Sequence, residues 1–249
     1  MQFTILFSAS KAMAKWLKLD APRIPSPDGK RIGTQPLITN AQKICWQCHV
    51  IENRPRSGLY TVLAVEAFSR YTLIIPYPGR PRLEDLENEI LRRWANELLN
   101  LMIVSGEIDE ADVDVVIEKF LELDKPIDWV SNTDLSVQGH ASDAGKWVTD
   151  TLYQDGGAAL DDDRAIALGL HINQFKKKSK DANGKIEHFY PMERMLDDAL
   201  FRFASGLAKD RYEQTRRGDF PNPFLPTLET INNEPMPSNV VQMANYRHK

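Results

Sequence analysis

The sequence has only two cysteines among its 249 residues, Cys45 and Cys48. Two neighbouring cysteines cannot form the disulfide framework of a small secreted domain. The chain also lacks any run of about 18 apolar residues that would predict a transmembrane helix. Its N-terminus lacks the positive segment of a signal peptide. We therefore expect a cytoplasmic protein with reduced thiols and no membrane association.

A strong charge of one sign is also missing, because the formal net charge is −4. No global basic field would draw this chain onto nucleic acid or anionic lipid. No Walker or dinucleotide glycine pattern occurs either, and we expect no cofactor. Hydrophobic residues make up 42% and charged residues 27% of the chain, which is ordinary globular composition.

The hydrophobic pattern predicts strands first, helices in the middle, and then a hairpin and another helix. Strand-like runs at 2–8, 43–52, 59–65 and 71–77 have short connections between the last three, which favours an antiparallel meander. Apolar residues at helical spacing predict helices near 83–101, 109–124, 142–153 and 191–203. We predict an α+β fold in which helices pack on an antiparallel sheet.

The predicted domain organisation is one α+β domain over residues 1–215. An alternative is a core over 1–155 with a hairpin and helix over 156–215 as an extension. Asn183-Gly184 is the strongest hairpin signal in this later part. Residues 216–249 are rich in proline and asparagine, and they predict a C-terminal tail outside the domain.

One motif points to a cofactor or a metal, the string Cys45-Trp46-Gln47-Cys48-His49. It matches the C-x-x-C-H pattern by which c-type haem is attached. The string lies in a strand-like run, however, and alternation would direct Cys45 and Cys48 to opposite faces of a sheet. A structural zinc site needs four donors, and no second ligand pair is spaced for it. We expect neither haem nor metal, but two core thiols, an aromatic anchor at Trp46 and a polar-face His49.

A second candidate is the polar segment 136–143, which we place at a loop-to-helix junction before Ser142. Such a junction offers backbone N–H groups to an anion. His140 and Asp143 lie one helical turn apart and could meet. Ser136 or Ser142 could serve as a nucleophile, although no G-x-S-x-G motif is present. The simpler interpretation is that Ser142 or Asp143 is the helix N-cap.

Two clusters of like charge complete the candidates. Asp161-Asp162-Asp163 could hold a divalent cation, but three carboxylates also suit the first turn of a helix. Lys176, Lys177, Lys178 and Lys180, with Arg211, Arg216 and Arg217, could contact nucleic acid. Lysines at a hairpin are more often solvated and discourage edge pairing of strands.

Part of the chain resembles the first hairpin of a retroviral-type integrase or transposase core. The resemblance lies in Trp46 to His49, Leu59 to Glu66, Phe68 to Tyr71, and Ile74 to Pro76. That family carries a catalytic aspartate on the first strand, which would fall near His49 here. Metal-dependent phosphoryl transfer needs carboxylates that bridge two hard cations. The resemblance therefore implies at most a degenerate RNase H-like site.

Another resemblance spans more of the chain, from the N-terminal strand to about residue 155. Trp46 and His49, then Ser69-Arg70-Tyr71, then the spacing Ser136-Val137-x-Gly139-x-x-x-Asp143 are similar to a bacterial family of uncharacterised domains. That family has no established activity, so the resemblance implies no reaction. It implies that separate segments converge on one candidate pocket, formed by Trp46, His49, Arg70, Tyr71, Ser136, His140 and Asp143.

These patterns favour a binding or regulatory protein of bacterial or mobile-element origin, without catalysis. One alternative is a metal-dependent hydrolase or nuclease with a degenerate RNase H-like site. Another is a nucleic-acid accessory protein that uses the basic clusters. The partner stays unknown: another protein or a second copy of the chain is open, and nucleic acid is less favoured. We assign no catalytic residue and no metal ligand from the sequence.

Overall fold

The computed structural model describes residues 4–26, 28–122, 126–180 and 185–204. These residues fall into two compact units. The sheet unit comprises the described residues up to 90 and from 126 to 191, and the helical unit comprises 91–122 and 192–204. The predicted tail over 216–249 lies outside the described residues. The extent of a single domain to residue 215 therefore stays a prediction.

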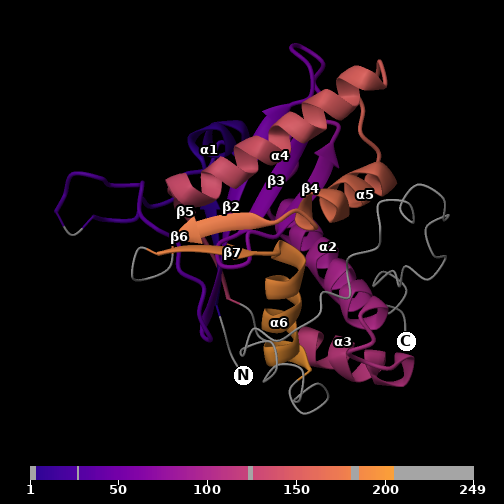
Figure 1. Ribbon diagram of the computed structural model, residues 1–249. Helices are drawn as coiled ribbons and strands as arrows, with labels where there is room; N and C mark the ends of the chain where they lie inside the picture. Colours follow the sequence, from indigo (N-terminus) through magenta and orange to yellow (C-terminus); the bar gives the residue numbers. More distant parts are fainter. Residues whose placement is uncertain (1–3, 27, 123–125, 181–184, 205–249) are drawn as a thin grey trace. The chain divides into compact units, whose positions relative to one another are not determined.

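The sheet unit is built on a five-stranded sheet with the strand order β4-β3-β2-β1-β5 (Figure 1). Its strands are β1 (Thr4–Ala9), β2 (Lys43–Glu52), β3 (Tyr60–Glu66), β4 (Thr72–Tyr77) and β5 (Ile127–Ser131). The strands β2, β3 and β4 form the antiparallel meander that their short connections predict. With helices on the sheet, the predicted α+β class is confirmed.

The prediction of a wholly antiparallel sheet is wrong, because β1 runs parallel to both β2 and β5. Leu6 on β1 lies beside Cys45 on one side and Asp128 on the other. Parallel neighbours need a crossover connection, and residues 10–42 supply it through α1 (Lys11–Leu17) and a long loop. The apolar pattern inside a strand does not contain the direction of its neighbour, so this pairing had no local signal.

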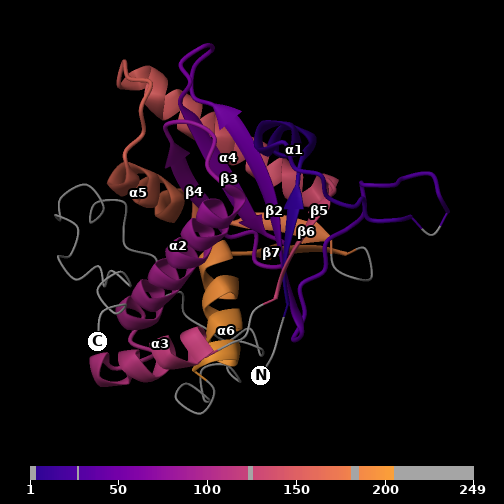
Figure 2. The ribbon, with the colours of Figure 1, turned by 180° about the vertical axis from the view of Figure 1, so that it is seen from behind.

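Helices cover both faces of the sheet: α4 (Leu135–Gln154) lies on one face and α1 on the other (Figures 1 and 2). Small residues let α4 approach closely, since a Cβ on Gly145 would lie 3.4 Å from Leu63 Cδ1. On the opposite face, the rings of Trp16 and Tyr60 are 5.2 Å apart. The buried positions of α4 recur at helical spacing: Val137, Ala141, Ala144, Val148 and Leu152.

The edge strand β4 is covered by α5 (Asp162–Asn173). The fully buried amide of Asn173 takes the place of a neighbouring strand. Its Oδ1 accepts from Thr72 N at 2.8 Å, and its Nδ2 donates to Thr72 O at 3.0 Å. These bonds satisfy backbone groups that an edge strand would otherwise expose to pairing with another chain.

After α5, the strands β6 (Lys177–Lys180) and β7 (Ile186–Phe189) pair antiparallel, as the hairpin signal predicts. The turn residues Asn183-Gly184 themselves lie outside the described residues. The first strand begins at Lys177, shortly after the end of α5 at Asn173.

The helical unit contains the later part of α2 (Leu83–Val104), η1 (Glu110–Asp112), α3 (Val113–Glu122) and most of α6 (Pro191–Phe203). Three aromatic rings from α2, α3 and α6 meet in its core. The ring centroids of Trp94 and Phe120 are 5.4 Å apart, and those of Phe120 and Phe203 are 5.1 Å apart. Edge-to-face and tilted pairs of this kind stabilise a small core beyond the apolar area they bury.

Candidate functional site

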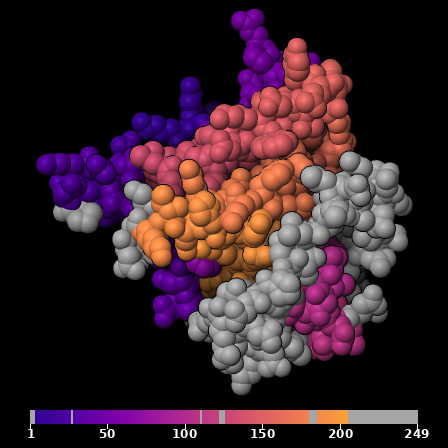
Figure 3. All heavy atoms as spheres, viewed as in Figure 1, coloured from indigo at the N-terminus to yellow at the C-terminus, as the bar shows by residue number. Residues whose placement is uncertain are grey.

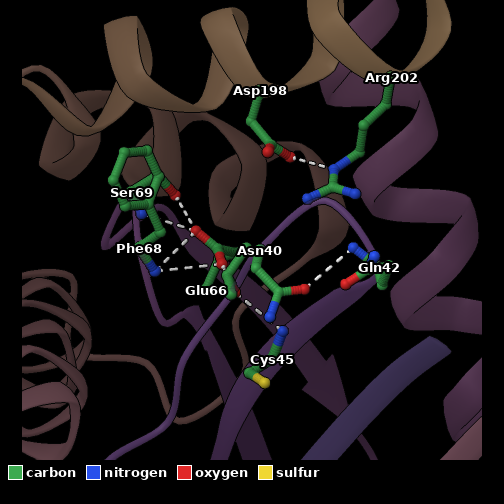
Figure 4. Close-up of polar contacts among 9 residues, drawn as sticks. Asn40, Gln42, Cys45, Glu66, Phe68, Ser69, Asp198 and Arg202 are labelled. Atoms are coloured by element: carbon green, nitrogen blue, oxygen red, sulfur yellow. Dashed lines mark hydrogen bonds and ion pairs between the residues drawn. The ribbon is translucent and has the colours of Figure 1, made fainter. Parts of the chain in front are cut away.

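The turn between β3 and β4 is organised by a buried carboxylate. Glu66 is 3% exposed. Its carboxylate accepts from Ser69 N at 2.6 Å, Ser69 Oγ at 2.7 Å and Phe68 N at 3.0 Å (Figure 4). The hydroxyl of Thr39 donates to it as well. A buried charge is tolerated when it has several donors, and these donors fix the shape of the turn that leads to Arg70.

Arg70 closes this turn in an unusual backbone conformation. Its φ is 62°, in the left-handed region that favours glycine. The residue is 9% exposed, and its Nη2 donates to Ser136 Oγ at 3.2 Å. Its Nη1 donates to Ala67 O. The turn therefore directs a buried guanidinium to the first turn of α4.

The start of α4 corrects one prediction from the sequence. The helix begins at Leu135 rather than near Ser142, and its N-cap is Asp134 rather than Ser142 or Asp143. Asp134 Oδ1 accepts from Ser136 N at 2.8 Å and Val137 N at 3.2 Å. These amides are therefore not open to an anion. The expectation of open amides at this junction was wrong. Gly139 lies inside the helix, so the polar segment that precedes Ser142 is helical and not a loop.

His140 lies on α4 and is partly buried. Burial of the ring is the main reason that the pKa of His140 falls from its usual 6.5 to about 4. The positive charges of Arg70 and Lys177 lower it further, while the carboxylates of Asp143 and Asp134 act in the opposite direction. At neutral pH the imidazole is uncharged and lies within the electric field of two cations.

Lys177, the first residue of β6, is half-buried, and burial lowers its pKa. Asp143 opposes this shift, so the two side chains lie within electrostatic reach of each other. Because residues four and three apart share a helix side, Ser136, His140 and Asp143 follow one another along α4. We call this group the Arg70 cluster: Arg70, Ser136, His140, Asp143 and Lys177. The first four were predicted for one pocket, and Lys177 was noticed only within the basic stretch.

Comparison with known protein families gives a match. The model of a family described as a domain of unknown function, DUF6933, covers residues 6–194. The chain belongs to this family. The expectation of an uncharacterised domain family is thereby confirmed, and the match extends beyond the predicted limit near residue 155. Neither the curated proteins nor the solved structures include a match to the chain.

The other residues of the predicted pocket lie elsewhere in this DUF6933 chain. His49 is on β2, where its Nδ1 is 2.8 Å from Ser10 Oγ, the N-cap of α1. Burial lowers the pKa of His49. Trp46 and Tyr71 are 0% exposed and belong to the core. The predicted set thus separates into the Arg70 cluster, a Ser10–His49 pair that sequence spacing could not reveal, and two core aromatics.

The residues of the C-x-x-C-H string lie on β2, and those of the acidic run lie at the start of α5. Among the described residues, no group of three or more His, Cys, Asp or Glu side chains is placed to hold a metal ion. Cys45 and Cys48 are free and buried. Asp161, in the acidic run, is the N-cap of α5 and accepts from Arg164 N at 2.8 Å. In this same part of the chain, no helix combines the length and apolar character needed to span a bilayer.

Proposed function

We propose that the sheet unit is a binding domain for a small anion, held at the Arg70 cluster. The observation that carries the proposal is the hydrogen bond from Arg70 Nη2 to Ser136 Oγ at 3.2 Å, which brings a buried guanidinium to the side of α4 that also carries His140. Arg70 and Lys177 come from separate segments, the β3–β4 turn and β6. Both cations lie within electrostatic reach of one side of α4, in a chain whose net charge is −4.

The carboxylates near His140 already interact with donors of their own. Asp134 accepts from three backbone N–H groups, those of Leu37, Ser136 and Val137. Asp143 Oδ1 is 3.3 Å from Lys146 Nζ. The cluster therefore combines a guanidinium, an ammonium, a hydroxyl and an imidazole N–H as donors. Phosphate and carboxylate oxygens are the acceptors that such charged donors bind best.

The contacts of Ser136 favour binding over hydrolysis. A serine nucleophile needs a neighbouring base that takes its proton. Among the described residues, Ser136 Oγ accepts a hydrogen bond from Arg70, and no hydrogen bond joins it to the neutral ring of His140. A guanidinium stays protonated in proteins and cannot act as that base. The reduced, buried thiols and the sequence resemblance support our further proposal of a cytoplasmic protein from a bacterium or mobile element.

The test is titration of the full chain with inorganic phosphate, sulfate and acetate by calorimetry. We expect at least one of them to bind, and Lys177→Met to weaken that binding about tenfold because it removes one charged partner. Lys178→Met is the matched control, since Lys178 is exposed and adjacent on β6. Equal affinity in both variants, or no binding of any anion at about 10 mM, would contradict the proposal.

A further inference from the structure

An aromatic pair lies on the same side of α4 as the Arg70 cluster. Trp147 and Phe175 stack with ring centroids 5.7 Å apart and planes 16° apart. They are 41% and 40% exposed. His171 of α5 packs edge-on against both rings, with centroids 5.4 Å from Trp147 and 4.8 Å from Phe175. The exposed ring surface is thus held in a fixed orientation.

The same two elements supply both the charges and the rings. Trp147 follows His140 by seven residues on α4, which is two helical turns on one side and about 10 Å along the axis. Phe175 lies in the bend between α5 and β6, two residues before Lys177, and its ring stacks on Trp147. The charged groups around His140 and Asp143 therefore lie earlier along α4, and the aromatic pair at Trp147 lies later along the same helix side.

The surface of the sheet unit agrees with this arrangement. Figure 3 shows α4 (salmon) and the segment from α5 into β6 (orange) side by side on the surface that faces the viewer. The ring contacts of Trp147 with His171 and Phe175 join the two elements. An exposed apolar surface next to a charged one is typical of a site with an amphipathic ligand.

We infer that the anion bound at the Arg70 cluster is the phosphate of a free mononucleotide, whose base stacks on the Trp147–Phe175 pair. This inference rests on the proposed anion site and adds the class of ligand. A sugar between the phosphate and the base suits the separation of the cationic and aromatic ends. Any of the bases can stack on aromatic side chains, because every base presents a π-face. The pair therefore does not select one base.

The experiment compares four ligands with the full chain: inorganic phosphate, ribose 5-phosphate, AMP and adenosine. Stacking of one base strengthens binding by about 10- to 100-fold. We therefore expect AMP to bind that much more tightly than ribose 5-phosphate, and to quench tryptophan fluorescence. Trp147→Leu and Phe175→Leu should each reduce this difference without changing the affinity for ribose 5-phosphate. Tyr153→Leu is the matched control, since Tyr153 is 83% exposed on the same helix.

Each other outcome has a defined meaning. Equal affinities for AMP and ribose 5-phosphate would overturn the nucleotide inference and leave the anion site standing. Failure of every phosphate compound to bind would overturn the nucleotide inference, and failure of sulfate and acetate as well would overturn the anion site. Adenosine binding as tightly as AMP would show that the phosphate is not recognised, which contradicts the inference. Much tighter binding of an oligoadenylate than of AMP would identify a strand as the ligand and would also overturn it.

Discussion

At the residue scale, Arg70 meets two opposing requirements. Its side chain reaches Ser136 on α4, which glycine could not do, while its φ of 62° suits glycine better than arginine. Left-handed backbone costs a residue with a Cβ about 1–2 kcal/mol. Such strain persists where the surroundings fix it and is frequent at functional sites. Here the hydrogen bonds of Glu66 to Ser69 and Phe68 fix the turn.

A pair of substitutions separates the two requirements. We expect Arg70→Gly to be more stable than Arg70→Ala by about 1 kcal/mol, because only glycine relieves the left-handed backbone. Both variants should lose anion binding. Urea unfolding at pH 7 measures the difference. At Arg82, which is exposed and does not have a positive φ, alanine should be at least as stable as glycine. Alanine equal to glycine at position 70 would contradict the assignment of strain.

The pKa of His140 should lie well below that of an ordinary histidine. Its folded pKa of about 4 lies below the usual 6.5, chiefly because of burial. Between these values the unfolded chain binds a proton that the folded chain does not, so stability decreases as the pH falls through this window. We expect His140→Gln to make stability less dependent on pH between 4 and 6.5, by roughly 2 kcal/mol over the window.

The direct measurement is the NMR titration of the His140 ring protons. The same protons in the urea-unfolded chain are the control and should titrate near 6.5. Addition of a bound anion should raise the pKa of His140, because negative charge stabilises the imidazolium. A folded pKa near 6.5 that does not respond to anions would mean that His140 is neither buried nor part of the cluster.

At the scale of elements, local patterns predicted most helices and the β2–β3–β4 meander, because apolar spacing and short turns are properties of adjacent residues. The start of α4 was missed because the polar segment 136–143 suggested a loop-to-helix junction, whereas Asp134 caps the helix through two backbone amides. The parallel pairing of β1 was missed because it joins segments separated by residues 10–42. Only the fold brings Arg70 and Lys177 within electrostatic reach of the same His140, so Lys177 had no distinguishing signal in the basic stretch.

The cap of α4 should contribute more to stability than the cap of α5. Asp134→Ala removes a cap worth about 1–2 kcal/mol and leaves the buried Leu37 N–H without its acceptor, for a total of about 2–4 kcal/mol. Asp161→Ala removes only a bond to Arg164 N at an exposed helix end and should cost about 1 kcal/mol. Urea midpoints at constant slope give the comparison. Equal losses would contradict the dual role of Asp134.

At the scale of the whole molecule, average properties conceal local ones. The net charge of −4 gives no reason to expect an anion site, yet the fold brings Arg70 and Lys177 toward one helix side. The C-x-x-C-H string also has a different role in the fold from the one its pattern suggests. Cys45 packs in the apolar cluster beneath α4, which includes Val137 and Val148. A strand directs Cys48 to the opposite face of the sheet.

The two thiols can therefore report how the sheet unit opens. Cys45 and Cys48 are 1% and 0% exposed. Burial raises the pKa of Cys45 to about 11 and that of Cys48 above its usual range. Thiolates are the reactive form, so both thiols should react with a disulfide reagent only when the sheet unit unfolds. In Cys45→Ala and Cys48→Ala, each remaining thiol should react at the same slow rate, which should follow the urea-dependent loss of sheet structure. Faster labelling of Cys45 alone would show instead that α4 separates from the sheet before the strands do, since only Cys45 lies beneath that helix.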